Sequence, residues 1–208
     1  TMIQLPKAAW QKQQSLRKQA DSKQLQPRKQ TAKKAPRRAA GIITEQPAGT
    51  YHNMLYGCSY FGYSLFGFYN GTYTAAFGEV VEGTDGCLYI HNMLTEMYTE
   101  EGYWVKAEKV DGQADTYVIH KQPIYEENYY GELYTYSIMK VKLNDEGTSF
   151  EPAANTDIKI TWKNGVLRTA SEFNNPNSLS TCIGAIDDSG YWSGFQYLFV
   201  DYFLYLFP

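Results

Sequence analysis

From residue 49 onward, short runs of Tyr, Phe, Val, Ile and Thr alternate with turns built from Asn, Asp and Gly. The runs suit a pleated, half-buried surface, whereas Asn, Asp and Gly tolerate the left-handed backbone of a tight reversal. The turn signals are Asn70-Gly71, Asp85-Gly86, Asp111-Gly112, Asn144-Asp145-Glu146-Gly147, Asn164-Gly165 and Asp187-Asp188-Ser189-Gly190. This spacing predicts strands joined by hairpins, and no stripe of apolar residues at helical spacing competes with it.

The clearest hairpin is predicted over residues 157–169, with Asn164-Gly165 as its turn. Its first arm alternates, which places Ile158, Ile160 and Trp162 on one face and polar residues on the other. The other predicted strands are Tyr60–Tyr69, Tyr73–Val81, Cys87–His91, Tyr103–Lys109, Thr116–His120, Leu133–Leu143, Thr181–Ile186 and Phe195–Leu206. We expect an all-β fold, an antiparallel β-sandwich or barrel of eight or more strands. The apolar ending, residues 195–207, would aggregate as an exposed edge, so a central or covered strand is expected there.

Charge divides the chain into two parts. Residues 1–47 hold eleven Lys and Arg against two acids, whereas the remainder carries eight Lys and Arg against 20 Asp and Glu. Of the aromatic residues only Trp10 lies in the first part. We therefore expect a disordered or partly helical basic tail or linker over residues 1–47, and an acidic, aromatic-rich domain over residues 48–208.

The tail contains the cluster Lys33-Lys34-Ala35-Pro36-Arg37-Arg38. Such a run is found in nucleic-acid patches, but its low complexity favours a solvated spacer. It would also attract the chain's own acidic domain, anionic lipid or cell-surface polymers. Nucleic acid is disfavoured for the domain, whose excess of acids repels phosphate. No apolar run is long enough for a membrane-spanning helix.

Recognised catalytic and metal-binding signatures are absent from the sequence. The chain has no nucleophile elbow, phosphate-binding loop or zinc-protease motif. Cys58, Cys87 and Cys182 lack the close spacing of zinc ligands, and they suit either one disulfide with a spare thiol or small buried residues. The three histidines are far apart, and a lone strand histidine is usually structural. We expect no cofactor, no metal and no enzymatic activity.

The remaining signal is aromatic surface. The domain holds more rings than a core of its size hides, and exposed tyrosine or tryptophan suits stacking on sugars or anchoring a protein. Five residues near turns or strand ends are the candidate ligand-binding positions: Trp104, Tyr129, Tyr130, Tyr191 and Trp192. The competing interpretation is cross-strand pairing or plain core packing, especially for Trp104.

Three stretches, 84–92, 102–107 and 116–125, resemble modules in uncharacterised secreted or surface proteins of gut and oral anaerobic bacteria. Those modules tend to begin at a segment similar to residues 45–50, after a basic leader similar to residues 35–39. Where this family often has glycine after the Trp-Val-Lys triplet, the chain has Ala107. The resemblance spans residues 35–208 and implies an exported, β-rich and non-catalytic protein. It also implies a signal peptide before Thr1 and further sequence after Pro208.

These observations lead to one hypothesis and two alternatives. The first is an exported, non-catalytic module at the cell surface, in the periplasm or outside the cell, which binds carbohydrate through exposed aromatic side chains. The second is a structural or adhesive envelope protein that packs against a protein partner at the cell surface. The third is a barrel around a small apolar ligand.

Overall fold

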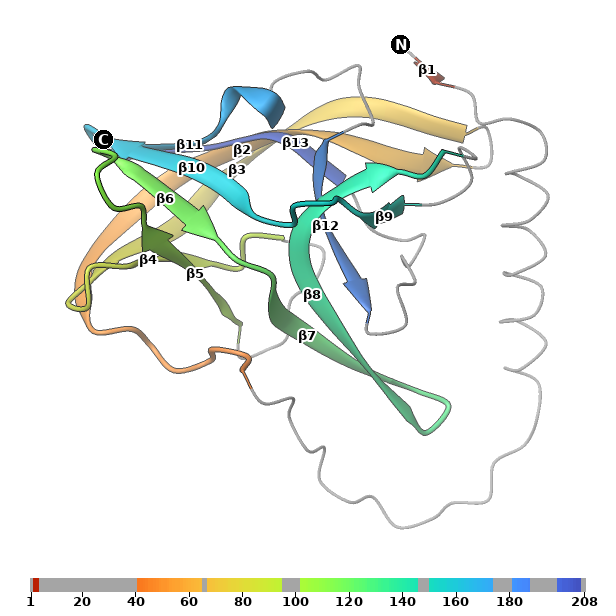
Figure 1. Ribbon diagram of the computed structural model, residues 1–208, viewed down its shortest axis with the longest axis horizontal. Helices are drawn as coiled ribbons and strands as arrows, with labels where there is room; N and C mark the ends of the chain where they lie inside the picture. The colour runs from red at the N-terminus through yellow and green to blue at the C-terminus, as the bar shows by residue number, and fades with distance from the viewer. Residues whose placement is uncertain are drawn as a thin grey trace.

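The computed structural model describes residues 2–3, 41–64, 67–94, 102–145, 150–173, 181–187 and 198–206. These residues form an all-β fold in which every strand pairing is antiparallel, as the sequence predicts (Figure 1). The strands are β1 (Met2–Ile3), β2 (Gly49–Ser64), β3 (Gly67–Gly83), β4 (Leu88–His91), β5 (Trp104–Lys109), β6 (Thr116–Ile119), β7 (Gln122–Tyr129), β8 (Glu132–Leu143), β9 (Phe150–Pro152), β10 (Ile158–Lys163), β11 (Val166–Thr169), β12 (Cys182–Asp187) and β13 (Leu198–Leu206). Within the described ranges the helical structure consists of one 3-10 turn, η1 (Ser171–Phe173).

Eight strands pair in a closed cycle, which we call the ring. It runs from β2 through β3, β4, β5, β6, β10, β11 and β13 back to β2. The closing strand β13 pairs with β2 along one edge, while its other edge meets β11 near Leu204 and β12 at Phe199. Residues 198–206 therefore form a central strand, as the composition of the C-terminal segment predicts.

A second group of strands leaves the ring where β13 meets β12. Strand β12 pairs with β8, and β8 pairs in turn with β7 and β9. Strands β7 and β8 continue beyond this group as a two-stranded ribbon that extends away from the ring (Figure 1). Strand β7 is the last in the strand order, so it forms one edge of the sheet within the described residues.

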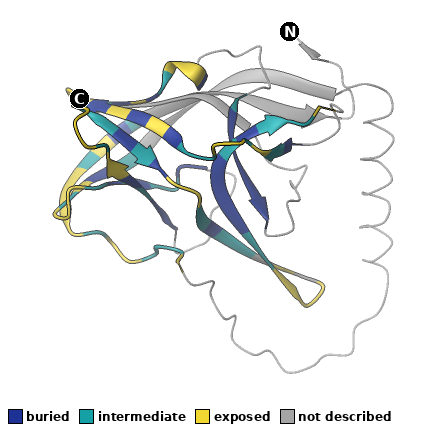
Figure 2. Ribbon diagram, viewed as in Figure 1, coloured by how far each residue is buried: buried dark blue, intermediate teal, exposed yellow. Residues whose placement is uncertain are grey.

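The core is formed by residues of the ring together with residues of β7, β8 and β12, such as Ile124, Ile138 and Ile183. Along β10 the residues alternate between buried and exposed, with Ile158, Ile160 and Trp162 inward (Figure 2). The residues that pair with them on neighbouring strands are also buried. For example, Ile160 pairs with the buried Tyr117 of β6. The alternation that the sequence predicts for this arm is confirmed, and it follows from one face of the strand being shielded from water.

The turns explain where the sequence prediction succeeds and fails. Asn164 and Gly165 have φ values of 52° and 73°, which is the left-handed geometry of a two-residue hairpin. Asn70-Gly71, by contrast, lies inside β3 and pairs with β2, so the turn predicted there is wrong. The single strand predicted over 60–69 is likewise the end of β2 and the start of β3.

Residues 41–48 lie against the sheet and are hydrogen-bonded to it. The Trp104 amide donates to the Ile43 carbonyl at 2.8 Å, and the Thr84 amide donates to the Ala48 carbonyl at 2.9 Å. Ile42 packs against the core, and Gly41 lies so close to β7 that a Cβ there would be 3.2 Å from Pro123 Cγ. Residues in the range 41–47, which the charge division places in the tail, thus contact the strands. The predicted disorder or partial helicity of the tail falls on positions 1 and 4–40, outside the described residues.

Candidate functional site

Trp104 is buried rather than exposed. Its side chain is 3% exposed, because Tyr51 covers it edge-on at 6.2 Å and His91 stacks on it at 4.5 Å between ring centroids. A ring buried to this extent has no exposed face on which a sugar could stack. The structure thus removes Trp104 from the predicted binding residues, and the packing interpretation applies to it instead.

Two other candidates lie together at the end of the β7–β8 ribbon. Tyr129 is the last residue of β7, and Tyr130 follows in the turn with 37% of its surface exposed. Tyr191 and Trp192 fall outside the described residues.

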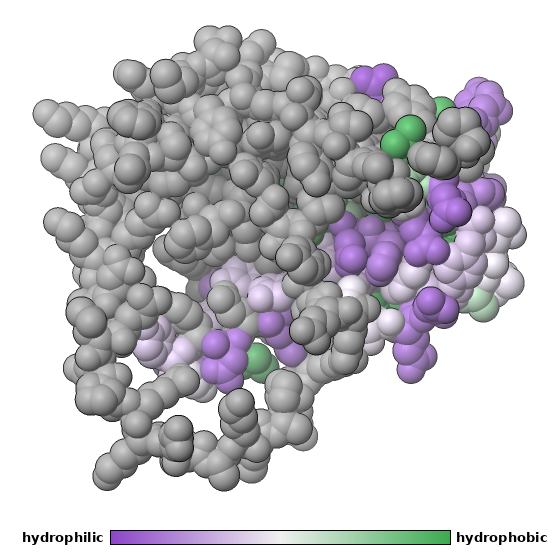
Figure 3. All heavy atoms as spheres, turned by 180° about the vertical axis from the view of Figure 1, so that it is seen from behind, coloured by the Kyte–Doolittle hydropathy of each residue, from purple (hydrophilic) through white to green (hydrophobic). Residues whose placement is uncertain are grey.

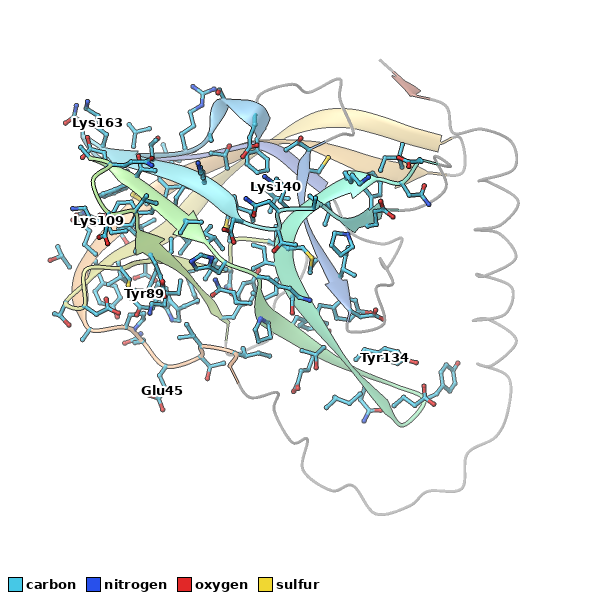
Figure 4. The ribbon with its side chains drawn as sticks, viewed as in Figure 1. Glu45, Tyr89, Lys109, Tyr134, Lys140 and Lys163 are labelled. Carbon is cyan, nitrogen blue, oxygen red and sulfur yellow. The ribbon has the colours of Figure 1, made fainter. Side chains whose placement is uncertain are left out.

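The far part of the ribbon, residues 125–136, combines aromatic rings with carboxylates, and we call it the aromatic ribbon. Its register pairs Tyr125 with Tyr136, Glu127 with Tyr134, and Tyr129 with Glu132. The rings of Tyr125 and Tyr136 lie 6.0 Å apart, and the Tyr134 hydroxyl donates to Glu132 Oε2 at 2.7 Å. Leu133 of the same ribbon is 45% exposed. Figure 4 shows Tyr134 on this ribbon, away from the ring.

The tip of the aromatic ribbon is a strained two-residue turn. Tyr130 has a φ of 53° and Gly131 a φ of 88°, and the Gly131 amide donates to Asn128 Oδ1 at 3.1 Å. Asn, Asp and Gly are the usual occupants of such a first turn position, because other side chains crowd the left-handed backbone. A tyrosine there is held in place at a conformational cost of about 1 kcal/mol.

Sequence reasoning did not identify a polar cluster formed by His52, Glu82 and Trp162. His52 Nε2 lies 2.7 Å from Glu82 Oε2, and Trp162 Nε1 donates to Glu82 Oε1 at 3.0 Å. The rings of His52 and Trp162 are 5.4 Å apart. His52 and Glu82 come from β2 and β3, which pair directly, whereas Trp162 comes from β10, which pairs with neither of these strands, so no local pattern in the sequence signals the cluster.

The hydrogen bond from His52 lowers the pKa of Glu82 below its ordinary value. Partial desolvation of the carboxylate raises this pKa, and the hydrogen bond from the Trp162 indole lowers it. A depressed pKa means that the charged carboxylate stabilises the fold at neutral pH, and that this contribution is lost as the pH falls through the folded-state pKa. Because the Glu82 side chain is 46% exposed, solvent screening keeps the contribution small.

We expect Glu82→Gln to flatten the acid limb of the stability curve. Thermal unfolding followed from about pH 7 to about pH 3 should show a shallower decline than the wild-type chain, because the titrating carboxylate is gone. Glu151→Gln is the matched control, since Glu151 pairs with Lys142 on β8 at 3.1 Å and takes no part in the cluster. Parallel curves for Glu82→Gln and wild type would contradict the assignment.

The other histidines lie in separate places. His120 Nδ1 is 2.9 Å from Asp157 Oδ1 at the surface, and His91 packs on Trp104. Within the described part of the chain no three His, Cys, Asp or Glu side chains gather as metal ligands would. Cys87 and Cys182 carry free thiols, and burial raises the pKa of Cys182 to about 12.

Comparisons with known proteins found no match among protein-family models, curated proteins or solved structures. Among the described residues no helix has the length and apolar character needed to cross a membrane.

Proposed function

We propose that the chain is an exported, non-catalytic module that binds carbohydrate through the aromatic ribbon. The observation that carries the proposal is the placement of Tyr130 and Leu133, 37% and 45% exposed, at the end of a ribbon that also carries carboxylates. A tyrosine ring stacks on the apolar face of a sugar, and a neighbouring carboxylate such as Glu132 accepts its hydroxyl hydrogens.

The backbone at Tyr130 supports the same proposal. A left-handed tyrosine in a turn that asparagine would fit better costs stability, and strained positions cluster where a side chain is presented to a ligand. A substitution that relieves this strain should raise stability while it removes the ring, so its effect on binding can be told apart from an effect on folding.

We expect Tyr130→Asn to raise stability by about 0.5–1 kcal/mol, because asparagine tolerates the left-handed backbone, and to weaken glycan binding at least about ten-fold, because the ring is lost. Binding is measured on a glycan array and then by titration with the glycans that respond. Tyr51→Ala is the control, since Tyr51 is 42% exposed but lies on β2, away from the ribbon.

Undiminished binding by Tyr130→Asn would contradict the ribbon as the sugar site. A blank array for the wild-type chain would instead favour the second candidate, a structural or adhesive protein that binds a protein partner. The position of β7 at the end of the order of described strands favours that candidate, because edge strands are where a partner's strand is added. A small apolar ligand inside the ring is not proposed, since fully buried side chains such as Ile160 and Ile90 occupy the interior.

Seen from behind, the coloured surface is mostly hydrophilic or neutral, and its apolar spots are small and separate (Figure 3).

A further inference from the structure

We propose that the glycans bound by the aromatic ribbon are amino sugars with free, positively charged amines. This inference rests on the proposed function, because it names the class of glycan that the same ribbon takes. It concerns the charge of the ligand, whereas the proposed function concerns stacking on a sugar ring, so the two can fail separately.

The charge of the ribbon is the first observation. Residues 122–139 include Glu126, Glu127 and Glu132, and they contain no Lys, Arg or His. Glu132 begins β8 next to the turn and is exposed. A group of carboxylates with no cation among them attracts positively charged ligands and repels uronic acids and sulfated sugars.

The second observation is that the ribbon's carboxylates lack the ion pairs found elsewhere in the protein. Glu108 pairs with Lys106 at 3.3 Å, and each of the three histidines lies 3.8 Å or less from a carboxylate oxygen. Among the described residues neither Glu126 nor Glu132 takes part in an ion pair. Within the part of the chain that the structure describes, their charge is therefore not neutralised by a neighbouring cation.

The turn brings an aromatic ring and a carboxylate close together, which is the third observation. Tyr130 and Glu132 are separated only by Gly131, so their Cα atoms lie at most about 7 Å apart. The Tyr134 hydroxyl donates to Glu132 Oε2 at 2.7 Å, which restricts the orientations of the carboxylate. Tyr130 and Glu132 are therefore close enough for one sugar residue to contact both.

This combination of groups suits an ammonium group better than a hydroxyl. The face of a tyrosine ring attracts cations, and a carboxylate accepts a charge-assisted hydrogen bond from a positively charged N–H donor. A neutral sugar stacks on the ring but gains nothing from the negative charge, and an acidic sugar is repelled. Sugars with free amines use both properties of the ribbon.

The test compares three sets of linear oligomers: glucosamine with free amines, the same oligomers fully N-acetylated, and oligomers of glucuronic acid. Calorimetric titration of the full chain is done at about pH 6, where amines are positively charged and carboxylates negatively charged. The free-amine oligomers are expected to bind at least about five-fold more tightly than the N-acetylated ones. High salt is expected to reduce this difference, and the glucuronic acid oligomers are expected to bind most weakly.

Glu132→Gln tests whether the ribbon is the source of the preference. It is expected to bring the affinities for the free-amine and N-acetylated oligomers within about two-fold of each other, because the charge is lost while an acceptor for the Tyr134 hydroxyl remains. Glu45→Gln is the matched control, since Glu45 is exposed on the segment 41–48, away from the ribbon that carries Tyr134 (Figure 4). This control is expected to keep the full preference, and far-ultraviolet circular dichroism verifies that both variants retain the sheet.

Three results would overturn the inference. Equal binding of the free-amine and N-acetylated oligomers, with both weakened by Tyr130→Asn, would overturn it and leave the proposed function standing, and so would preferential binding of the glucuronic acid oligomers. A full preference for free amines in Glu132→Gln would assign the preference to another part of the protein. Absence of binding to every oligomer would overturn this inference together with the proposed function.

Discussion

Trp162→Ala is expected to lower the free energy of unfolding by about 3–5 kcal/mol. Trp162 is 9% exposed on β10, inside the ring, and it pairs with the fully buried Leu167 of β11. Removing the indole leaves a large cavity beside β10 and β11, which are both strands of the ring. It also removes the donor to Glu82 Oε1, which lies 3.0 Å from the indole nitrogen.

Trp162→Phe separates these two effects. The phenyl ring keeps most of the apolar volume, so its expected cost is smaller, about 1–2 kcal/mol, and comes from the lost hydrogen bond and partial underpacking. Urea unfolding at neutral pH measures both variants. A loss below about 1 kcal/mol for Trp162→Ala would show that β10 contributes little to the core, contrary to its position in the ring.

The sequence predicts the local features of this fold well. The β10–β11 hairpin follows from alternating apolar residues and an Asn164-Gly165 turn, both of which act between neighbours in the chain. Strands β4, β5, β6, β8 and β12 lie within a residue or two of their predicted bounds. Each of these strands has a run of apolar or β-branched residues that a buried face requires.

The sequence does not predict β7, and its composition explains why. Glu126-Glu127-Asn128 interrupts any alternation, because this strand is an edge and its far end lies beyond the core. A strand that buries no continuous face leaves no period-two signal. The turn at Tyr130-Gly131 could have indicated a hairpin here. It is not recognisable from the sequence, because tyrosine is an unusual residue at the first position of such a turn.

Contacts between residues far apart in the chain are also beyond sequence reasoning. Glu82 and Trp162 are 80 positions apart, on strands that do not pair, and His52 and Glu82 are 30 apart, on two long paired strands. The burial of Trp104 has a similar origin. Tyr51, His91 and the segment 41–48 reach it from three different parts of the chain, so its flanking residues alone could not decide between surface and core.

Tyr103 binds the backbone at the start of the connection between β4 and β5 through a buried hydroxyl. Tyr103 is 1% exposed, and its hydroxyl both accepts from the Leu94 amide and donates to the Leu94 carbonyl, each at 2.8 Å. The backbone of the same residue is fixed as well, since its amide donates to Asn92 Oδ1 at 2.9 Å and its carbonyl accepts from the Asn92 amide at 2.9 Å. Tyr103 therefore holds both ends of the segment that joins the two strands.

Tyr103→Phe is accordingly expected to cost about 2–4 kcal/mol, although it removes only one oxygen atom, because it leaves a buried amide and a buried carbonyl unsatisfied. Tyr89→Phe is the matched control. Its hydroxyl donates to the exposed Asp85 carboxylate at 2.7 Å, which water can solvate instead, so a loss below about 1 kcal/mol is expected. Urea unfolding of the two variants gives the comparison, and equal losses would show that the Leu94 backbone finds other partners when the hydroxyl is absent. A larger loss for Tyr103→Phe would establish that one side chain stabilises the β4–β5 connection by completing the hydrogen bonds of a backbone that water cannot reach.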